Sequence, residues 1–274
     1  MTQLLFDVGG TKTRIAIARN GVIGTPIIMP TEKNFDRAID GFVDTVKQLG
    51  AMPFEISAVA GGVRSLDKKR GVLRAQPHFP LWVGKPLRLT LAKRFGAPVY
   101  LENDAALAAL GEAVYGAGKN KRIVAYLTVS TGVGGAIVID KHISESMQGF
   151  EPGNQIIGGT RIKPLRLEAV VSGKAFERRY KKPAREIKSR RVWQEAAQVL
   201  ALGIHNSIVH WSPEVVVLGG GLLRKSAIRL TEVSAELNRL LVVYPKVPQL
   251  NAAQFGDESA IYGGLALILQ QKKR

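Results

Sequence analysis

The feature that most constrains the fold is a pattern that occurs twice: an apolar strand, a bend rich in Gly and Thr, and a second apolar strand. It is found at residues 3–19, QLLFDVGGTKTRIAIAR, and again at residues 123–139, IVAYLTVSTGVGGAIVI. Each copy predicts two strands joined by a short bend. Because the copies lie about half a chain apart, they suggest two related domains that face one another.

Helical spacing alternates with strand spacing along the rest of the chain. Phe35, Ile39, Phe42 and Val46 recur at three- and four-residue intervals, which predicts a helix within residues 31–50 that ends at Gly50. Further helices are predicted at 86–96, 105–118 and 192–211, and further strands within 55–62, 97–104 and 213–223. This alternation predicts an α/β fold.

Composition narrows the classes of function. The chain has no cysteine, which excludes disulfides, Cys-based zinc sites and Cys nucleophiles. Its four histidines lack metal-ligand spacing, and no Gly-x-Ser-x-Gly elbow is present. The N-terminus does not resemble a signal peptide, and the longest uncharged run, residues 123–139, is too short to span a bilayer. We therefore expect a cytoplasmic protein that does not enter a membrane.

The charge is strongly basic, with 39 Lys and Arg against 22 Asp and Glu, or +17. Such a field attracts polyanions, including nucleic acid and polyphosphate. A solvated basic surface explains the same charge. No DNA- or RNA-binding module is recognisable, so no specific nucleic-acid partner is expected.

The two bends are candidate phosphate sites. Glycine lets the backbone approach a ligand closely, and consecutive N–H groups form a concavity that binds anions. A hairpin turn would explain one such bend, but two bends and the glycines at 219–221 favour phosphate binding. Asp7 ends the first strand, and a carboxylate beside phosphate needs a cation such as Mg²⁺. An Asp that bonds only to the turn backbone is the alternative.

Other polar residues stand where a polyhydroxylated substrate could bind. Asp104 follows a strand end, where it either caps a helix or accepts a proton from an attacking hydroxyl in phosphoryl transfer. Glu151, Asn154 and Glu168 could pair with sugar hydroxyls, which both donate and accept hydrogen bonds. Taken singly, each could equally be a surface residue or a cap.

These segments in this order resemble the ROK family of sugar kinases, in the actin/hexokinase-like ATPase superfamily. The similar segments are a first phosphate motif at 7–21, a sugar-domain segment at 60–82, a catalytic segment at 99–119, a second phosphate motif at 125–143, an adenosine motif at 215–223 and a closing helix at 255–269. The resemblance implies two actin-like (ribonuclease H-like) domains with a central cleft: residues 1–103 plus 258–274, and residues 104–257. It also implies a homodimer.

The resemblance assigns roles residue by residue. Asp104 would be the catalytic base, and Asp7 would position Mg²⁺, directly or through water. The substrate contacts would be Gly61, Gly62, Asn103, Asp104, Glu151, Asn154 and Glu168. The phosphates and adenosine of ATP would contact Asp7, Gly9, Gly10, Thr11, Lys12, Thr131, Gly132, Gly219 and Gly220.

One departure concerns zinc. Asn154 stands where the family has a His that normally binds a structural zinc together with a Cys-rich loop, and this chain has no cysteine. We therefore expect no zinc. The lost His also contacts the sugar in the family, so the sequence does not identify the hexose.

The resemblance thus implies an ATP- and Mg²⁺-dependent hexose kinase, of the glucokinase or hexokinase type, acting at the 6-hydroxyl. A polyphosphate-dependent glucokinase is the first alternative, because the basic run at 177–191 suits a long polyanion. A sugar-responsive regulator without activity is the second. Family members of that kind carry a DNA-binding domain before the first phosphate motif, whereas here the first strand begins within the first few residues.

Overall fold

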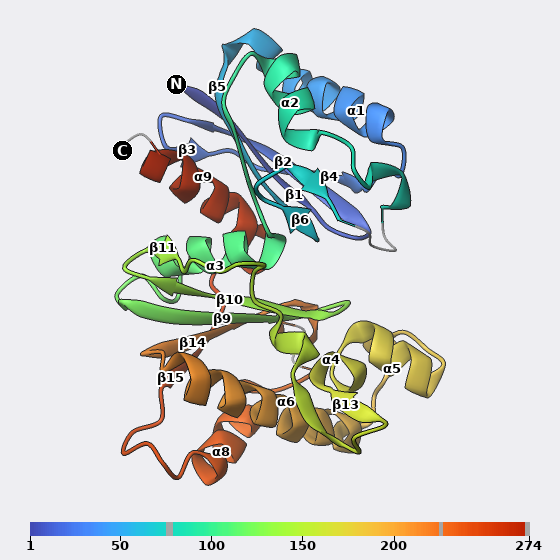
Figure 1. The fold of residues 1–274 in the computed structure, drawn as a ribbon, viewed down its shortest axis with the longest axis vertical. Coiled ribbons are helices and arrows are strands. Elements are labelled where there is room, and N and C mark those ends of the chain that lie inside the picture. The colour runs from blue at the N-terminus through green and yellow to red at the C-terminus, as the bar shows by residue number, and fades with distance from the viewer. Residues whose placement is uncertain (75–78, 225–226, 272–274) are drawn as a thin grey trace. The chain divides into compact units, whose positions relative to one another are not determined.

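The computed structural model describes residues 1–74, 79–224 and 227–271, and it divides the chain into two compact units (Figure 1). The first comprises Met1–Gly111 and Glu258–Arg274, and the second comprises Glu112–Asp257. Residues 75–78, in the segment that resembles the sugar domain, lie outside the described residues. The predicted roles of the two domains, with a boundary at residues 103 and 104, stay predictions.

The first unit contains a mixed six-stranded sheet. Five strands follow the order β3-β2-β1-β5-β8, and β4 pairs with β2. The strands are β1 (Thr2–Val8), β2 (Lys12–Arg19), β3 (Val22–Ile23), β4 (Ile27–Pro30), β5 (Ile56–Val63) and β8 (Val99–Glu102). Strands β1 and β2 are antiparallel, whereas β1, β5 and β8 are parallel. The carboxyl ends of these three strands therefore meet at one edge of the sheet.

Helices cover both faces of this sheet (Figure 1). Leu4 and Phe6 of β1 are buried in one core with α1 and α2, while the intervening Leu5 is buried with α9. This alternation follows from the two-residue period of a strand. The other elements of this unit are α1 (Phe35–Gln48), η1 (Pro53–Glu55), β6 (Leu66–Asp67), β7 (Val72–Leu73), η2 (Pro80–Trp82), α2 (Leu87–Phe95), α9 (Ser259–Gln271) and the start of α3 (Asp104–Val114).

The second unit repeats this strand arrangement in a five-stranded sheet of order β11-β10-β9-β14-β15. Strands β9 and β10 are antiparallel, and β14 is parallel to both β9 and β15. The strands are β9 (Ile123–Val129), β10 (Val133–Ile139), β11 (His142–Ile143), β14 (Val215–Gly219) and β15 (Gln249–Ala252). Both strand–bend–strand pairs predicted from the sequence are confirmed.

The core of the second unit lies between its sheet and the helices α6 and α8. Leu127 and Val216 of the sheet are buried in one cluster with Leu200 and Ile204 of α6 and Leu237 of α8. The remaining elements are η3 (Pro152–Asn154), β12 (Ile156–Gly159), β13 (Pro164–Arg166), α4 (Leu167–Val170), α5 (Gly173–Tyr180), η4 (Ala184–Glu186), α6 (Arg190–Trp211), α7 (Gly221–Arg224), α8 (Leu230–Leu240) and η5 (Gly256–Glu258). None of the helices in the described ranges is long and apolar enough to cross a bilayer.

Candidate functional site

The ends of three parallel strands place the candidate residues of the first unit in one row. Asp7 of β1 lies beside Gly62 of β5, and Gly62 lies beside Glu102 of β8. Asn103 and Asp104 follow Glu102 directly. A Cβ atom added to Gly62 would lie 3.1 Å from the Cα of Asp104, so the strand and the start of α3 are in close contact. The register of one sheet therefore brings Asp7, Gly62 and Asp104 to one edge.

Asn103 and Asp104 form the start of α3. Asn103 Oδ1 accepts hydrogen bonds from the backbone N–H groups of Ala105 and Ala106, at 3.0 and 3.3 Å. Asn103 is therefore the cap of this helix, a role that the sequence analysis considered for Asp104. Asp104 is the first residue of the helix, and its Oδ1 accepts from the Ala105 N–H at 3.0 Å.

Burial raises the pKa of the Asp104 carboxyl above the ordinary value for aspartate. The charge of Arg64 and the hydrogen bonds from backbone N–H groups oppose this rise. Asp104 is nevertheless half-buried and not sealed from solvent. The raised pKa makes the Asp104 carboxylate a stronger base, and its partly open position leaves it accessible to a proton donor.

Two charged neighbours of Asp104 were not singled out from the sequence. Glu102 is 5% exposed, accepts from the Asn103 N–H at 2.9 Å and pairs with Lys68 Nζ at 2.5 Å. Arg64 directly follows β5 and acts electrostatically on Asp104. The sequence places Glu102 two residues before Asp104, but only the fold shows that Lys68 pairs with Glu102 and that Arg64 acts on Asp104.

The first bend is held by its own backbone and by two side chains. The Gly9 N–H donates to Lys12 O at 2.9 Å, Thr31 Oγ1 donates to Gly9 O at 2.8 Å, and Lys33 Nζ donates to Gly10 O at 3.1 Å. Thr11 and Lys12 are exposed at its tip. These contacts fix the shape of the bend and leave the side chains of its tip exposed to a ligand.

Asp7 lies beside this bend and is paired with Arg14, its cross-strand neighbour. Their nearest charged atoms are 3.3 Å apart, and each side chain is 13% exposed. Within the described ranges, no group of three or more His, Asp or Glu residues could hold a metal ion. Magnesium in kinase sites needs only one or two carboxylates, with phosphates and water completing its shell. Asp7 therefore fits as a single protein ligand.

The second bend contacts the start of a helix. The amides of Gly173 and Lys174 in α5 donate to Ser130 O at 2.7 Å and to Thr131 O at 3.2 Å. Ser172 caps this helix by accepting from the Ala175 N–H at 3.1 Å. Thr131 is exposed, whereas Gly132 is buried. The contacts with α5 hold Thr131 at the surface of its unit.

The predicted sugar-binding carboxylates of the second unit have local partners. Glu168 Oε2 accepts from the Val133 N–H at 2.7 Å, directly after the second bend. Glu151 precedes η3, where Asn154 Nδ2 lies 3.4 Å from its Oε2. Arg166 donates to Asn154 O at 2.8 Å. The residues between Asn154 and Glu168 form the hairpin β12–β13.

Three of the predicted ligand glycines are required by packing of the protein itself. A Cβ atom on Gly61 would lie 2.2 Å from the Phe6 ring, and one on Gly219 would lie 2.3 Å from Tyr126 Oη. Gly220 has a φ of +98° and would clash with Val129 O. Packing within the protein therefore explains why these positions are glycine. Their contact with a ligand stays a prediction.

The ROK family model matches residues 4–271. The chain belongs to the ROK family. Thermotoga maritima glucokinase is 25% identical over 308 residues, covering 97% of this chain and 96% of that protein. Pediococcus pentosaceus fructokinase is 27% identical, with 96% of each chain covered. The ROK hexokinase structure from Thermus thermophilus matches with a TM-score of 0.82 and 27% identity over all of both chains.

These matches confirm the predicted fold class, an α/β protein built from two actin-like ATPase domains. The named ROK relatives are kinases of different sugars. Membership in the ROK family therefore does not identify a sugar substrate for this chain.

Proposed function

We propose that this protein is an ATP- and Mg²⁺-dependent hexose kinase that phosphorylates the 6-hydroxyl, with Asp104 as general base. The observation that carries the proposal is the row formed by Asp7, Gly62 and Glu102, which delivers Asn103 and Asp104 to the edge that also carries the first bend. The sugar kinases among its relatives support the reaction class.

The proposed reaction transfers one proton and one phosphoryl group. The Asp104 carboxylate would take the proton of the sugar hydroxyl as its oxygen bonds to the γ-phosphorus, and the bond to the β-phosphate oxygen would break. Asn103 Oδ1 is used by the helix, which leaves its Nδ2 to donate to a sugar oxygen. Glu151, Asn154 and Glu168 would orient other hydroxyls.

The two bends would hold the donor phosphates through backbone N–H groups and the hydroxyls of Thr11 and Thr131. Magnesium, when bound near Asp7, would neutralise charge on those phosphates. Arg14 keeps the Asp7 side chain in place through their ion pair. Gly219 and Gly220 would lie against the adenosine, as the resemblance implies.

The proposal is tested by product formation from glucose, mannose, fructose, N-acetylglucosamine and N-acetylmannosamine, with ATP and Mg²⁺. Phosphorus NMR of the product reports which hydroxyl carries the phosphate. Transfer to the 6-hydroxyl of at least one sugar is expected. Transfer to another position would contradict the assignment, and omission of Mg²⁺ should abolish turnover.

A second candidate donor, polyphosphate, is favoured by one surface. Residues 177–191 carry eight Lys or Arg against two Glu, and most of these side chains are exposed. The segment begins within the last turn of α5, and the first amides of this helix contact the second bend. A long polyanion with its terminal phosphate at this bend could extend along α5. Turnover with polyphosphate that falls in an Arg178→Gln/Arg179→Gln variant, while turnover with ATP persists, would support this donor.

A homodimer and a cytoplasmic location belong to the same proposal. The homodimer follows from the resemblance and the location from the composition. Size-exclusion chromatography with light scattering measures the oligomeric state directly.

A further inference from the structure

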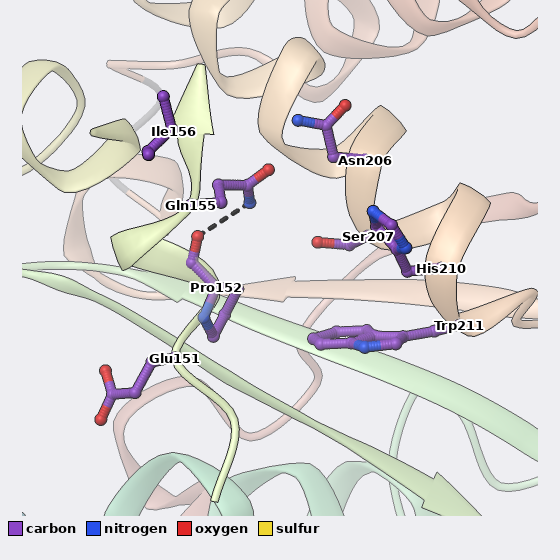
Figure 2. Close-up of a pocket in the computed structure, with 8 residues that line it drawn as sticks. All are labelled: Glu151, Pro152, Gln155, Ile156, Asn206, Ser207, His210 and Trp211. Carbon is purple, nitrogen blue, oxygen red and sulfur yellow. Dashed lines mark hydrogen bonds between the residues drawn. The ribbon is translucent and has the colours of Figure 1, made fainter. Parts of the chain in front are cut away.

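A cavity of about 390 Å³ opens within the second unit, between residues 151–156 and the last turns of α6 (Figure 2). Its volume falls within the range of sites for small molecules. Asn206, Ser207, His210 and Trp211 face it from α6, and Pro152 faces it from η3. The proposed mechanism assigns no role to this cavity.

The lining combines an aromatic ring with hydrogen-bonding side chains. Trp211 is held edge-to-face against Phe150, with ring centroids 5.4 Å apart. Asn206 is half-buried and His210 is exposed, so an amide and an imidazole are available beside the indole. An apolar ring face next to groups that both donate and accept hydrogen bonds suits a sugar ring.

Charge selects against a phosphorylated ligand. No Lys or Arg lines this cavity within the described ranges, although the chain carries 39 of them. The one carboxylate of the lining belongs to Glu151. A phosphate group would find no Lys or Arg in this lining to offset its charge. The lining therefore favours an uncharged sugar over a sugar phosphate.

Gln155 links the cavity to the segment proposed to bind substrate. Its Nε2 donates to Pro152 O at 2.8 Å and to Gly203 O of α6 at 3.1 Å, which fixes the amide. Its Oε1 is buried and accepts no hydrogen bond from any described residue. In Figure 2 this oxygen faces the α6 side of the cavity. A buried acceptor without a donor is costly, which points to a donor that the described residues do not supply.

We propose that this cavity is a second, non-catalytic site for an unphosphorylated hexose, which stacks on Trp211. Because Glu151 lies on its rim and is also proposed to contact the substrate, occupancy of the cavity would change the affinity of the substrate site. This coupling rests on the proposed function, whereas binding in the cavity does not. Any such coupling must be reciprocal between the two sites.

Trp211 provides a local probe of occupancy. The chain has three tryptophans, and Trp82 and Trp193 are only 1% and 5% exposed. Titration with D-glucose, without nucleotide, should shift the indole ¹H–¹⁵N resonance of Trp211, assigned with a Trp211→Phe variant. Calorimetry should give one glucose molecule per chain for the cavity, and two per chain where glucose is also the substrate. D-glucose 6-phosphate should bind the cavity at least about tenfold more weakly.

A variant that fills the cavity distinguishes binding in the cavity from binding at the catalytic site. Asn206→Phe should occupy the space, remove the Trp211 shift and lower the number of bound glucose molecules by one, whereas Asn206→Ala keeps the cavity open and should leave both unchanged. An unshifted Trp211 resonance in wild type would overturn the inference even if ATP-dependent turnover is found. A Trp211 shift without any turnover would support the cavity and contradict the proposed function. The wild-type measurements decide the inference should Asn206→Phe not fold.

Discussion

Glu168 Oε2 accepts a hydrogen bond from the backbone N–H of Val133 at 2.7 Å. Glu168 is the first acidic residue of α4, and Val133 begins β10 directly after the second bend. One carboxylate proposed to bind sugar therefore also fixes the strand that follows the loop proposed to bind phosphate. A substitution at this position should affect folding and substrate affinity together.

We expect Glu168→Ala to destabilise the protein by about 1–3 kcal/mol, because the buried Val133 amide loses its partner. The KM for the hexose should rise about 10- to 100-fold. Glu168→Gln keeps an oxygen that can accept from Val133, so its free energy of unfolding should stay near that of wild type while the KM still rises. Urea unfolding and steady-state kinetics measure the two effects. An unchanged KM in both variants would remove Glu168 from the substrate contacts.

Replacing each of two adjacent glycines by alanine should affect different properties of the protein, stability at Gly61 and turnover at Gly62. A Cβ atom on Gly61 would lie 2.2 Å from the fully buried Phe6 ring, so Gly61→Ala should cost about 1–3 kcal/mol of stability. A Cβ atom on Gly62 would lie 3.1 Å from the Asp104 Cα. Gly62→Ala should therefore lower kcat, while its free energy of unfolding should stay closer to that of wild type than that of Gly61→Ala does. Equal effects of both variants on kcat would argue against close positioning of Asp104 by Gly62.

The pH dependence of activity should report the ionisation of Asp104. Burial raises the pKa of this carboxyl, and the charge of Arg64 lowers it. A general base must be ionised, so kcat/KM should fall as the pH drops through this raised pKa. Arg64→Gln removes the opposing charge and should move the acidic limb to higher pH. Lys47→Gln, which removes an exposed charge on α1, is the matched control and should leave the limb in place.

Much of the fold could be predicted because the signals are local. The alternation in 3–19 and 123–139 defines two strand pairs, and the spacing of Phe35, Ile39 and Phe42 defines α1. The row of Asp7, Gly62 and Glu102 can also be predicted once β1, β5 and β8 are recognised as parallel strands, because their carboxyl ends lie at the same edge of the sheet.

Other features could not be predicted because they depend on contacts between distant segments. Nothing in the sequence near Glu168 indicates that Val133, 35 residues away, is its partner. Arg64 and Lys68 look like ordinary surface cations, and only the end of β5 and the following turn bring them near Asp104 and Glu102. The cavity beside Trp211 depends likewise on packing of α6 against η3.

The most direct test of the account compares wild type with Asp104→Asn, using ATP, Mg²⁺ and the hexose that wild type phosphorylates. Asparagine keeps an oxygen for the Ala105 N–H, so the start of α3 and the unfolding midpoint should be preserved. The account predicts a fall in kcat of about 10²- to 10⁴-fold. A folded Asp104→Asn protein with wild-type turnover would contradict the assignment of Asp104 as the base.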